Sequence, residues 1–299
     1  MPRHFLTGAE LTPAELHALL ARAAELKAAP RSSKALHEKI VALVFEQPST
    51  RTRTSFEAGI VELGGHPMVL RAGELQISRG ESIKDTALVL SRHVDAIGIR
   101  TVPHAVVEEL AAEAGVPVFN MLTGDHHPVQ ALADLQTLAE TFGRLEGLKL
   151  AYVGDGNNVA RSLAILGGMA GVEVAIASPE EFELEGETYG ATLHRDPAEA
   201  VAGAHAVYTD VWLSMGDSEE SAAVRRAALE PYRLDDALLD RAADGAIALH
   251  DLPAHPGEEI TAEVMYGPRQ RIWDQAENRR HAQKALLELL LGTEAADAR

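Results

Sequence analysis

The first 45 residues show two different patterns of hydrophobic and polar positions. In LTPAELHALLARAAELKAA, residues 11–29, leucine and alanine recur at helical spacing. Thr12 stands in the N-cap position, Pro13 is suited to the first turn, and Glu15 completes a capping box, so a helix is predicted here. KIVALVF, residues 39–45, is almost continuously apolar and predicts a buried strand.

Helix and strand patterns then alternate as far as residue 143. Strands are predicted at 66–72, 95–100 and 116–121, and helices at 55–65, 82–94, 106–115 and 128–143. Regular alternation of this kind is typical of an α/β fold, in which a parallel sheet is covered by helices on both faces.

The alternation restarts after a break near residues 141–148. Strands are predicted at 148–155, 172–178, 206–212 and 245–252, and helices at 158–171, 197–204 and 277–292, with a polar loop after residue 212. We therefore predict two domains, 1–144 and 145–299, each a parallel sheet flanked by helices. The leucine-rich last helix, about 278–293, must pack on something that its own pattern does not identify.

The amino-acid composition limits the kinds of molecule that this chain is expected to bind. With 27 Lys+Arg against 45 Asp+Glu, the net charge is -18, which argues against binding to nucleic acid or to anionic membranes. The chain has no cysteine, so a disulfide framework, a thiolate metal site and a thiol nucleophile are all excluded. No uncharged stretch is long enough to cross a bilayer, and we expect a cytoplasmic enzyme acting on small molecules.

The stretch FEQPSTRTRTSF, residues 45–56, joins the first buried strand to a helix. Ligands of open α/β sheets lie beyond the carboxyl ends of strands, where helix N-termini offer backbone N–H groups. Ser49, Thr50 and Thr52 add hydroxyl donors, and Arg51 and Arg53 add guanidinium groups suited to phosphate or carboxylate. An anion site is predicted here. The alternative is that Ser49 only caps the helix while the arginines pair with Glu46 and Glu57.

A second polar cluster precedes the helix at 128–143. His127 can donate or accept a proton near neutral pH, and Gln130 offers both a donor and an acceptor. A histidine in a loop is also often a plain surface residue.

The second half opens with VGDGNNVARSL, a strand, a glycine turn and a helix. Gly154 and Gly156 match the first two glycines of a dinucleotide fingerprint, but Val159 stands in the place of the third, and no clear acidic ribose ligand follows. A nicotinamide cofactor is therefore disfavoured. Asn157 and Asn158 place amide groups at the strand end, where one of them is expected to cap the helix.

Two further loops follow apolar strands and are expected to open into the same crevice. TDVWLSMGDSEES contains Asp210 and Ser214, and LHDLPAHPGEEI contains Asp251. These side chains predict an anionic crevice suited to a cationic amine. The alternative is that both loops are merely solvated.

Six motifs together resemble the ornithine carbamoyltransferases over nearly the whole chain: S-T-R-T-R, H-P-x-Q, G-D-G-N-N, D-x-W-x-S-M-G, H-x-L-P and A-E-N-R. The resemblance implies transfer of the carbamoyl group of carbamoyl phosphate to the δ-amine of L-ornithine, giving L-citrulline and phosphate in arginine biosynthesis. It also implies an N-terminal carbamoyl phosphate domain on which the last helix packs back, a C-terminal amino-acid domain, and a homotrimer, or a multiple of trimers, with shared active sites. No cofactor, metal ion or covalent intermediate is implied.

The resemblance also implies site residues. The residues expected to bind carbamoyl phosphate are Ser49, Thr50, Arg51, Thr52, Gln76, Arg100, His127, Gln130 and Arg279, with Gln76 reaching into a neighbouring subunit. Those expected to bind ornithine are Asn158, Asp210, Ser214, Met215, Asp251 and Leu252. The predicted catalytic residues are Arg51, Arg100, His127 and Asp251.

One residue departs from the family pattern. The ornithine enzymes normally read H-C-L-P, whereas here Asp251 replaces the cysteine. A carboxylate beside the reacting amine either holds its ammonium form and raises its pKa, or acts as a general base with Asp210. A transcarbamoylase for putrescine, lysine or an N-acylated ornithine is the alternative function, and a dinucleotide-binding α/β protein is the remote one.

Overall fold

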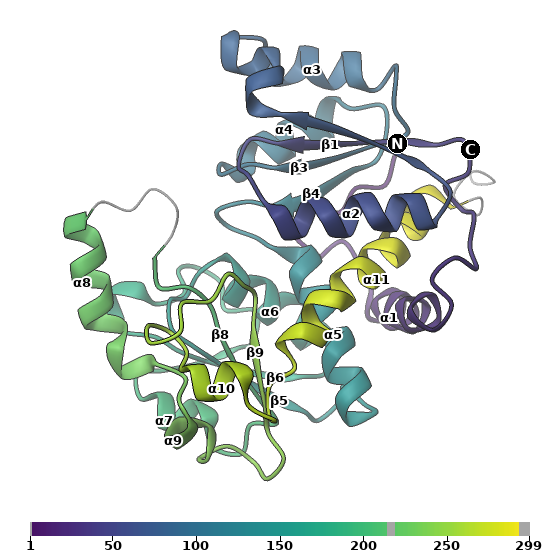
Figure 1. Ribbon diagram of the computed structural model, residues 1–299. Helices are drawn as coiled ribbons and strands as arrows, with labels where there is room; N and C mark the ends of the chain where they lie inside the picture. The colour runs from purple at the N-terminus through teal and green to yellow at the C-terminus, as the bar shows by residue number, and fades with distance from the viewer. Residues whose placement is uncertain (1, 214–218, 293–299) are drawn as a thin grey trace. The chain divides into compact units, whose positions relative to one another are not determined.

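The computed structural model describes residues 2–213 and 219–292, and the chain divides into two compact units (Figure 1). One unit comprises Met1–Gln136 with Glu277–Arg299, and the other comprises Thr137–Ala276. The change from one unit to the other occurs within a helix at both places, α5 (Pro128–Phe142) and α11 (Ile272–Leu291).

The first unit is built on a four-stranded sheet in the order β2-β1-β3-β4, with all pairs parallel. Its strands are β1 (Ile40–Phe45), β2 (His66–Arg71), β3 (Ala96–Arg100) and β4 (Val118–Leu122). The helices of this part of the chain are α1 (Pro13–Ala28), α2 (Thr50–Glu62), η1 (Ala72–Glu74), η2 (Gln76–Arg79), α3 (Ile83–Leu90) and α4 (His104–Glu113).

Helices cover both faces of this sheet, as its apolar strands require. Ala42 and Val44 of β1 share one core with residues of α3 and α4. Helix α2 lies on the opposite face (Figure 1). Its Phe56 stacks on Phe119 of β4, with ring centroids 5.1 Å apart. Because parallel strands end at the same edge, this layering brings the start of α2 and the carboxyl ends of β3 and β4 together.

The C-terminal helix α11 packs back on the N-terminal unit, which confirms the expectation from the resemblance. Glu288 accepts hydrogen bonds from Arg22 of α1 at 2.6 and 3.2 Å, and Asn278 accepts one from Lys27 at 2.8 Å. The leucine pattern of α11 could not identify α1 as its partner, because these contacts join residues about 250 positions apart in sequence.

The second unit contains a five-stranded parallel sheet in the order β7-β6-β5-β8-β9. Its strands are β5 (Lys149–Val153), β6 (Glu173–Ala177), β7 (Thr192–His194), β8 (Ala206–Thr209) and β9 (Ile247–His250). Its helices are α6 (Asn158–Met169), η3 (Glu180–Phe182), α7 (Pro197–Val201), α8 (Glu219–Leu229), η4 (Glu230–Tyr232), α9 (Asp236–Leu239) and α10 (Ala262–Tyr266).

This second sheet is also covered on both faces. Ala151 and Val153 of β5 share a core with residues of α7, α9 and α10, whereas α6 lies against Val174 on the opposite face. Both predicted parallel sheets are therefore confirmed. No helix in the described part of the chain is both long and apolar enough to cross a membrane.

The sequence predictions missed β7 and α10, and they need correction at three further places. The segment after residue 212, predicted as a polar loop, contains α8 and α9. The sequence of α8, EESAAVRRAAL, buries only a narrow alanine and leucine stripe and therefore lacks a strong apolar period. Helix α2 begins at Thr50 rather than at residue 55, and α11 begins at Ile272 rather than at residue 277 or 278.

Candidate active site

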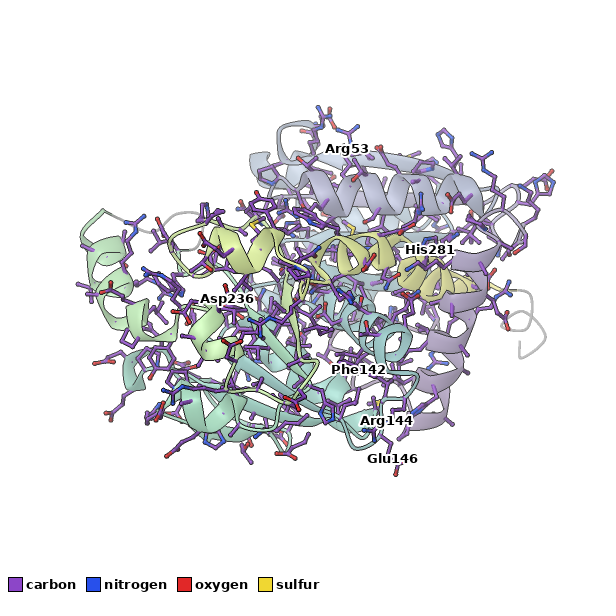
Figure 2. The ribbon with its side chains drawn as sticks, turned by 60° about the horizontal axis from the view of Figure 1, so that its bottom comes forward. Arg53, Phe142, Arg144, Glu146, Asp236 and His281 are labelled. Atoms are coloured by element: carbon purple, nitrogen blue, oxygen red, sulfur yellow. The ribbon has the colours of Figure 1, made fainter. Side chains whose placement is uncertain are left out.

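The first turn of α2 carries the serine, threonine and arginine run. Ser49 is the N-cap, and its hydroxyl accepts a hydrogen bond from the Thr52 backbone N–H at 3.3 Å. Capping does not exclude anion binding, because the first backbone N–H groups of a helix have no partner within the helix. Arg53 pairs with Glu57 at 3.0 Å on the exposed side of the helix (Figure 2), as in the alternative interpretation.

Arg51 differs from Arg53 because its charge lies near a buried histidine. His127 is 1% exposed. Burial, together with the charges of Arg279, Arg100 and Arg51, holds the pKa of His127 well below its usual range. A neutral imidazole surrounded by three guanidinium groups is suited to donating a hydrogen bond to an anionic or carbonyl ligand, and it is not poised to act as an acid.

A buried chain of hydrogen bonds links three elements beside His127. Arg279 of α11 donates from Nη1 to Gln130 Oε1 at 2.6 Å and from Nη2 to Thr52 Oγ1 at 2.9 Å. Gln130 in turn donates from Nε2 to Asp134 at 2.8 Å. Thr52, Gln130 and Asp134 have no exposed surface, so these groups are held in one arrangement before any ligand binds.

Sequence reasoning did not single out Asp134. It follows Gln130 by four residues on α5, and this helical spacing is the signal that could have identified it. By accepting from the Gln130 amide nitrogen, Asp134 turns the amide oxygen toward Arg279.

Of the nine predicted carbamoyl phosphate residues, eight lie at the start of α2, at the carboxyl end of β3, or in the cluster around His127. These eight are Ser49, Thr50, Arg51, Thr52, Arg100, His127, Gln130 and Arg279. Gln76 is instead exposed on the turn η2, as a residue that serves a neighbouring subunit would be.

In the second unit, Asn157 rather than Asn158 is the residue that caps α6. Its Oδ1 accepts from the backbone N–H groups of Val159 and Ala160 at 2.9 and 3.2 Å, and from the Tyr152 hydroxyl at 3.2 Å. Its Nδ2 donates to Asp210 at 2.9 Å. Asn157 therefore ties the helix start to the carboxylate that follows β8, and Asn158 is the half-buried first residue of α6.

Asp210 is a buried carboxylate in an anionic setting. It is 6% exposed and accepts from the Val211 backbone N–H at 2.8 Å. Burial and the negative charge of Asp251 raise the pKa of Asp210 to about 7. Burial and the charges of Asp210, Asp155 and Asp251 also raise the pKa of the Tyr152 hydroxyl. A bound cation would be stabilised by the negative charge of these carboxylates.

The loop that carries Asp251 is anchored by residues to which the sequence analysis gave no role. His250 donates from Nε2 to the buried Glu259 at 3.1 Å, and its Nδ1 accepts from the Leu252 backbone N–H at 2.8 Å. Leu252 has φ 66°, in the left-handed region, and this hydrogen bond holds it there. Ser214 and Met215 lie outside the described residues.

The family is identified by comparison with known proteins. Residues 3–140 match the carbamoyl-P binding domain of the aspartate/ornithine carbamoyltransferases, and residues 146–290 match their Asp/Orn binding domain. The chain belongs to this family.

Individual family members are similar over nearly their full length. The ornithine carbamoyltransferase of Acidothermus cellulolyticus is 52% identical, with 97% of each chain covered, and that of Parafrankia sp. is 51% identical, covering 97% of this chain and 96% of the relative. The structure of the Thermus thermophilus enzyme has a TM-score of 0.91 at 43% identity over 97% of this chain and 99% of that one. The Pyrococcus furiosus enzyme has a TM-score of 0.92, also at 43% identity, with 97% of each chain covered.

The structure also explains why a family member carries part of a dinucleotide fingerprint. A Cβ atom on Gly156 would lie 2.3 Å from the Leu184 backbone nitrogen, because residues 182–184 pack directly against the turn. In a dinucleotide site the corresponding glycine leaves room for the pyrophosphate. Here protein backbone fills that room, which argues against the remote alternative.

Proposed function

We propose that this chain transfers the carbamoyl group of carbamoyl phosphate to the δ-amine of L-ornithine, giving L-citrulline and phosphate. The observation that carries the proposal is the buried cluster in which Thr52, Gln130 and Arg279 form one hydrogen-bonded chain beside a neutral His127. The chain's membership of the transcarbamoylase family, and its similarity to ornithine enzymes at about half of all positions, support the choice of reaction.

In the proposed reaction, the first turn of α2 binds the phosphate of carbamoyl phosphate. Ser49, Thr50, Arg51 and Thr52 supply hydroxyl, guanidinium and backbone donors at a helix N-terminus. Three residues around His127, namely Arg100, Gln130 and Arg279, also bind carbamoyl phosphate by donating hydrogen bonds to its phosphate or its carbamoyl group. Gln76 of a neighbouring subunit completes this set.

The amino acid binds at the carboxyl ends of the strands of the second unit. The carboxylate of Asp210 accepts hydrogen bonds from the α-ammonium group of ornithine. Asn158, Ser214 and Met215 bind the same end of the substrate, at its α-amino and α-carboxylate groups. Asp251 and Leu252 contact the side-chain amine. The carboxylates of Asp210 and Asp251 favour a substrate with two cationic amines over a neutral one.

The chemical step balances without a cofactor or a covalent enzyme intermediate. The lone pair of the neutral δ-amine forms the new C–N bond, the carbonyl oxygen becomes an oxyanion, and the C–O bond to phosphate then breaks. The departing phosphate takes a proton from the attacking nitrogen. Arg51, Arg100 and His127 stabilise the charge on oxygen and phosphate as it develops, which lowers the barrier to reaction.

The first test is release of phosphate and formation of a ureido product, measured with ornithine, putrescine, lysine, N-acetylornithine and aspartate over a pH series. A strong preference for ornithine is expected. Preference for putrescine, lysine or N-acetylornithine would instead identify a transcarbamoylase for that amine, and Asp251 would then be the residue that marks the changed specificity. No turnover with any amine would overturn it.

A pair of neighbouring arginines gives a matched test of the phosphate site. We expect Arg51→Met to lower kcat/KM for carbamoyl phosphate by about 100-fold or more, because it removes a charged donor from the developing phosphate. Arg53→Met removes the same charge from the same helix, but Arg53 is already paired with Glu57 in a partly exposed ion pair, so its effect should be at most about twofold. Equal effects of the two substitutions would contradict this assignment.

A trimeric assembly with shared sites and a cytoplasmic location remain predictions of the family resemblance and of the composition.

A further inference from the structure

Helix α11 contains a lysine that is completely buried. Lys284 has 0% side-chain exposure, and the hydrogen-bond partners of its ammonium group belong to the first unit. Its ammonium group donates to the Leu26 backbone carbonyl at 3.1 Å, to the Pro30 carbonyl at 2.9 Å and to Glu62 Oε2 at 2.6 Å. These three bonds use all three donors of the ammonium group.

The acceptors of Lys284 come from two helix ends that converge at one place. Leu26 lies in the last turn of α1 and Pro30 just beyond it, where carbonyl oxygens lack partners and carry partial negative charge. Glu62 is the last residue of α2. Lys284 therefore joins α11 to α1 and α2 through a single atom.

Gly59 allows α2 and α11 to approach each other closely near Lys284. A Cβ atom on Gly59 of α2 would lie 3.1 Å from Lys284 Cγ and 3.5 Å from the Arg280 carbonyl oxygen. The lysine stem therefore passes directly over Gly59 on its way to Glu62. Arg280 adds a second contact from α11 to Glu62 at 3.4 Å.

Helix α11 is thus bound to α2 at two levels. Arg279 contacts Thr52 in the first turn of α2, and Lys284 contacts Glu62 at its other end. Lys284 follows Arg279 by five positions, which is about 7.5 Å along the helix axis. A slip of α11 by one residue would move the Arg279 guanidinium by about 1.5 Å, more than its hydrogen bonds to Thr52 and Gln130 tolerate.

Stability alone does not explain a charged residue here. Replacing a buried ion pair by apolar residues of similar volume is often neutral or stabilising, so a methionine would fill the same space. Apolar contacts are non-directional and would allow α11 to pack in several axial positions. Three hydrogen bonds from Lys284 to two carbonyl groups and a carboxylate can form in only one of these positions.

We propose that Lys284 is a positioning residue for carbamoyl phosphate: its three hydrogen bonds fix the axial position of α11 and thereby the place of Arg279 beside Thr52 and Gln130. This inference rests on the proposed function, in which Arg279 binds the phosphate. Lys284 itself does not touch the substrate.

The test compares Lys284→Met, the double variant Lys284→Met/Glu62→Met, and Glu288→Gln as a control. The double variant also removes Glu62, so no carboxylate is left without its lysine partner, and it should fold even where Lys284→Met does not. Glu288→Gln weakens another contact between α1 and α11, the pair with Arg22, and removes none of the three hydrogen bonds of Lys284. The measurements are inhibition by inorganic phosphate, KM for carbamoyl phosphate, KM for ornithine, and unfolding in urea.

For the double variant we expect phosphate affinity to fall about tenfold and KM for carbamoyl phosphate to rise to match, with KM for ornithine changed less than twofold. Glu288→Gln should leave phosphate affinity unchanged even if it lowers the unfolding midpoint. Wild-type phosphate affinity in the double variant would overturn the positioning role while leaving the proposed function intact. A wild-type protein that binds no phosphate and turns over no carbamoyl phosphate would overturn the proposed function itself.

Discussion

At the scale of single residues, the feature that sets this chain apart from the usual family pattern is Asp251. It follows β9, where the H-x-L-P motif normally carries cysteine, and its charge acts on Asp210 and on the Tyr152 hydroxyl. Two carboxylates close together cannot both ionise as easily as one alone. The amino-acid side of the proposed site should therefore respond to pH near neutrality.

We predict that Asp251→Asn and Asp251→Cys shift the pH profile of kcat/KM for ornithine toward lower pH. In the proposed function the ionised carboxylate of Asp210 binds the α-ammonium group, so activity is expected to fall as pH drops through the pKa of Asp210, about 7. Removing the negative charge of Asp251 lowers that pKa. It also removes a charge that holds the δ-amine in its ammonium form, so both effects move the profile in the same direction, by roughly one pH unit.

The control for this shift is Asp240→Asn. Asp240 lies in the same unit and pairs with Arg269 on the surface, so its replacement changes the net charge equally without approaching Asp210. An unmoved profile in the Asp251 variants would show that this carboxylate does not act on the reacting groups.

At the scale of elements, the turn between β5 and α6 depends on contact with another segment. Gly156 donates its backbone N–H to the Phe182 carbonyl at 2.8 Å, and its α-carbon lies against Glu183 and Leu184. Asp155 in the same turn pairs with Arg225 of α8, whose Nε donates to the Trp212 carbonyl at 2.9 Å. The turn that presents Asn157 and Asn158 is thus held by segments that follow it by 25 to 70 residues.

Gly156→Ala is expected to destabilise the second unit and to weaken ornithine binding. The added methyl group would lie 2.3 to 2.8 Å from backbone atoms of residues 183 and 184, which cannot turn away as a side chain could. We expect a cost of about 1 to 3 kcal/mol in unfolding free energy and a higher KM for ornithine, with phosphate affinity unchanged. Urea unfolding and steady-state kinetics measure both.

Gly115→Ala is a suitable comparison, because its added methyl group would make only an ordinary contact with Ser91 at 3.7 Å. If Gly156→Ala left KM for ornithine unchanged, the turn would not be part of the amino-acid site.

At the scale of the whole molecule, the proposed function requires more than one copy of the chain, because Gln76 is assigned to a neighbour's site. We predict a mass in solution of three times 32.0 kDa or a multiple of that, measured by sedimentation equilibrium. Gln76 is exposed on η2, where a neighbouring subunit could reach it.

Mixing two inactive variants tests whether sites are shared. Gln76→Ala and Arg279→Met should each be nearly inactive, yet trimers reassembled from both should recover part of the activity. In a mixed trimer, one kind of site combines Arg279 of the first variant with Gln76 of the second, and that site is intact. A monomeric mass, or mixed trimers without activity, would contradict the shared site.

Most of the alternation of strands and helices, though not β7, α8, α9 or α10, and the polar residues that follow the predicted strands could be predicted from the sequence alone. Continuous apolar runs predict buried parallel strands, and the Thr12–Glu15 capping box predicts the start of α1, because both depend on neighbours a few residues away. Arg51, His127 and Asp210 could be chosen from the sequence because ligands of open α/β sheets lie beyond the carboxyl ends of the strands.

Only the tertiary structure decided which of these residues act together. The charge of Arg51 acts on the buried His127, whereas Arg53 pairs with Glu57, although the two arginines stand two positions apart. The tertiary structure assigned the cap of α6 to Asn157, joined Arg279 to Thr52 across 227 residues, and revealed Asp134, Glu259 and Lys284 as buried hydrogen-bond partners of other groups. Burial and hydrogen-bond geometry depend on contacts between distant segments, and those contacts exist only once the chain has folded.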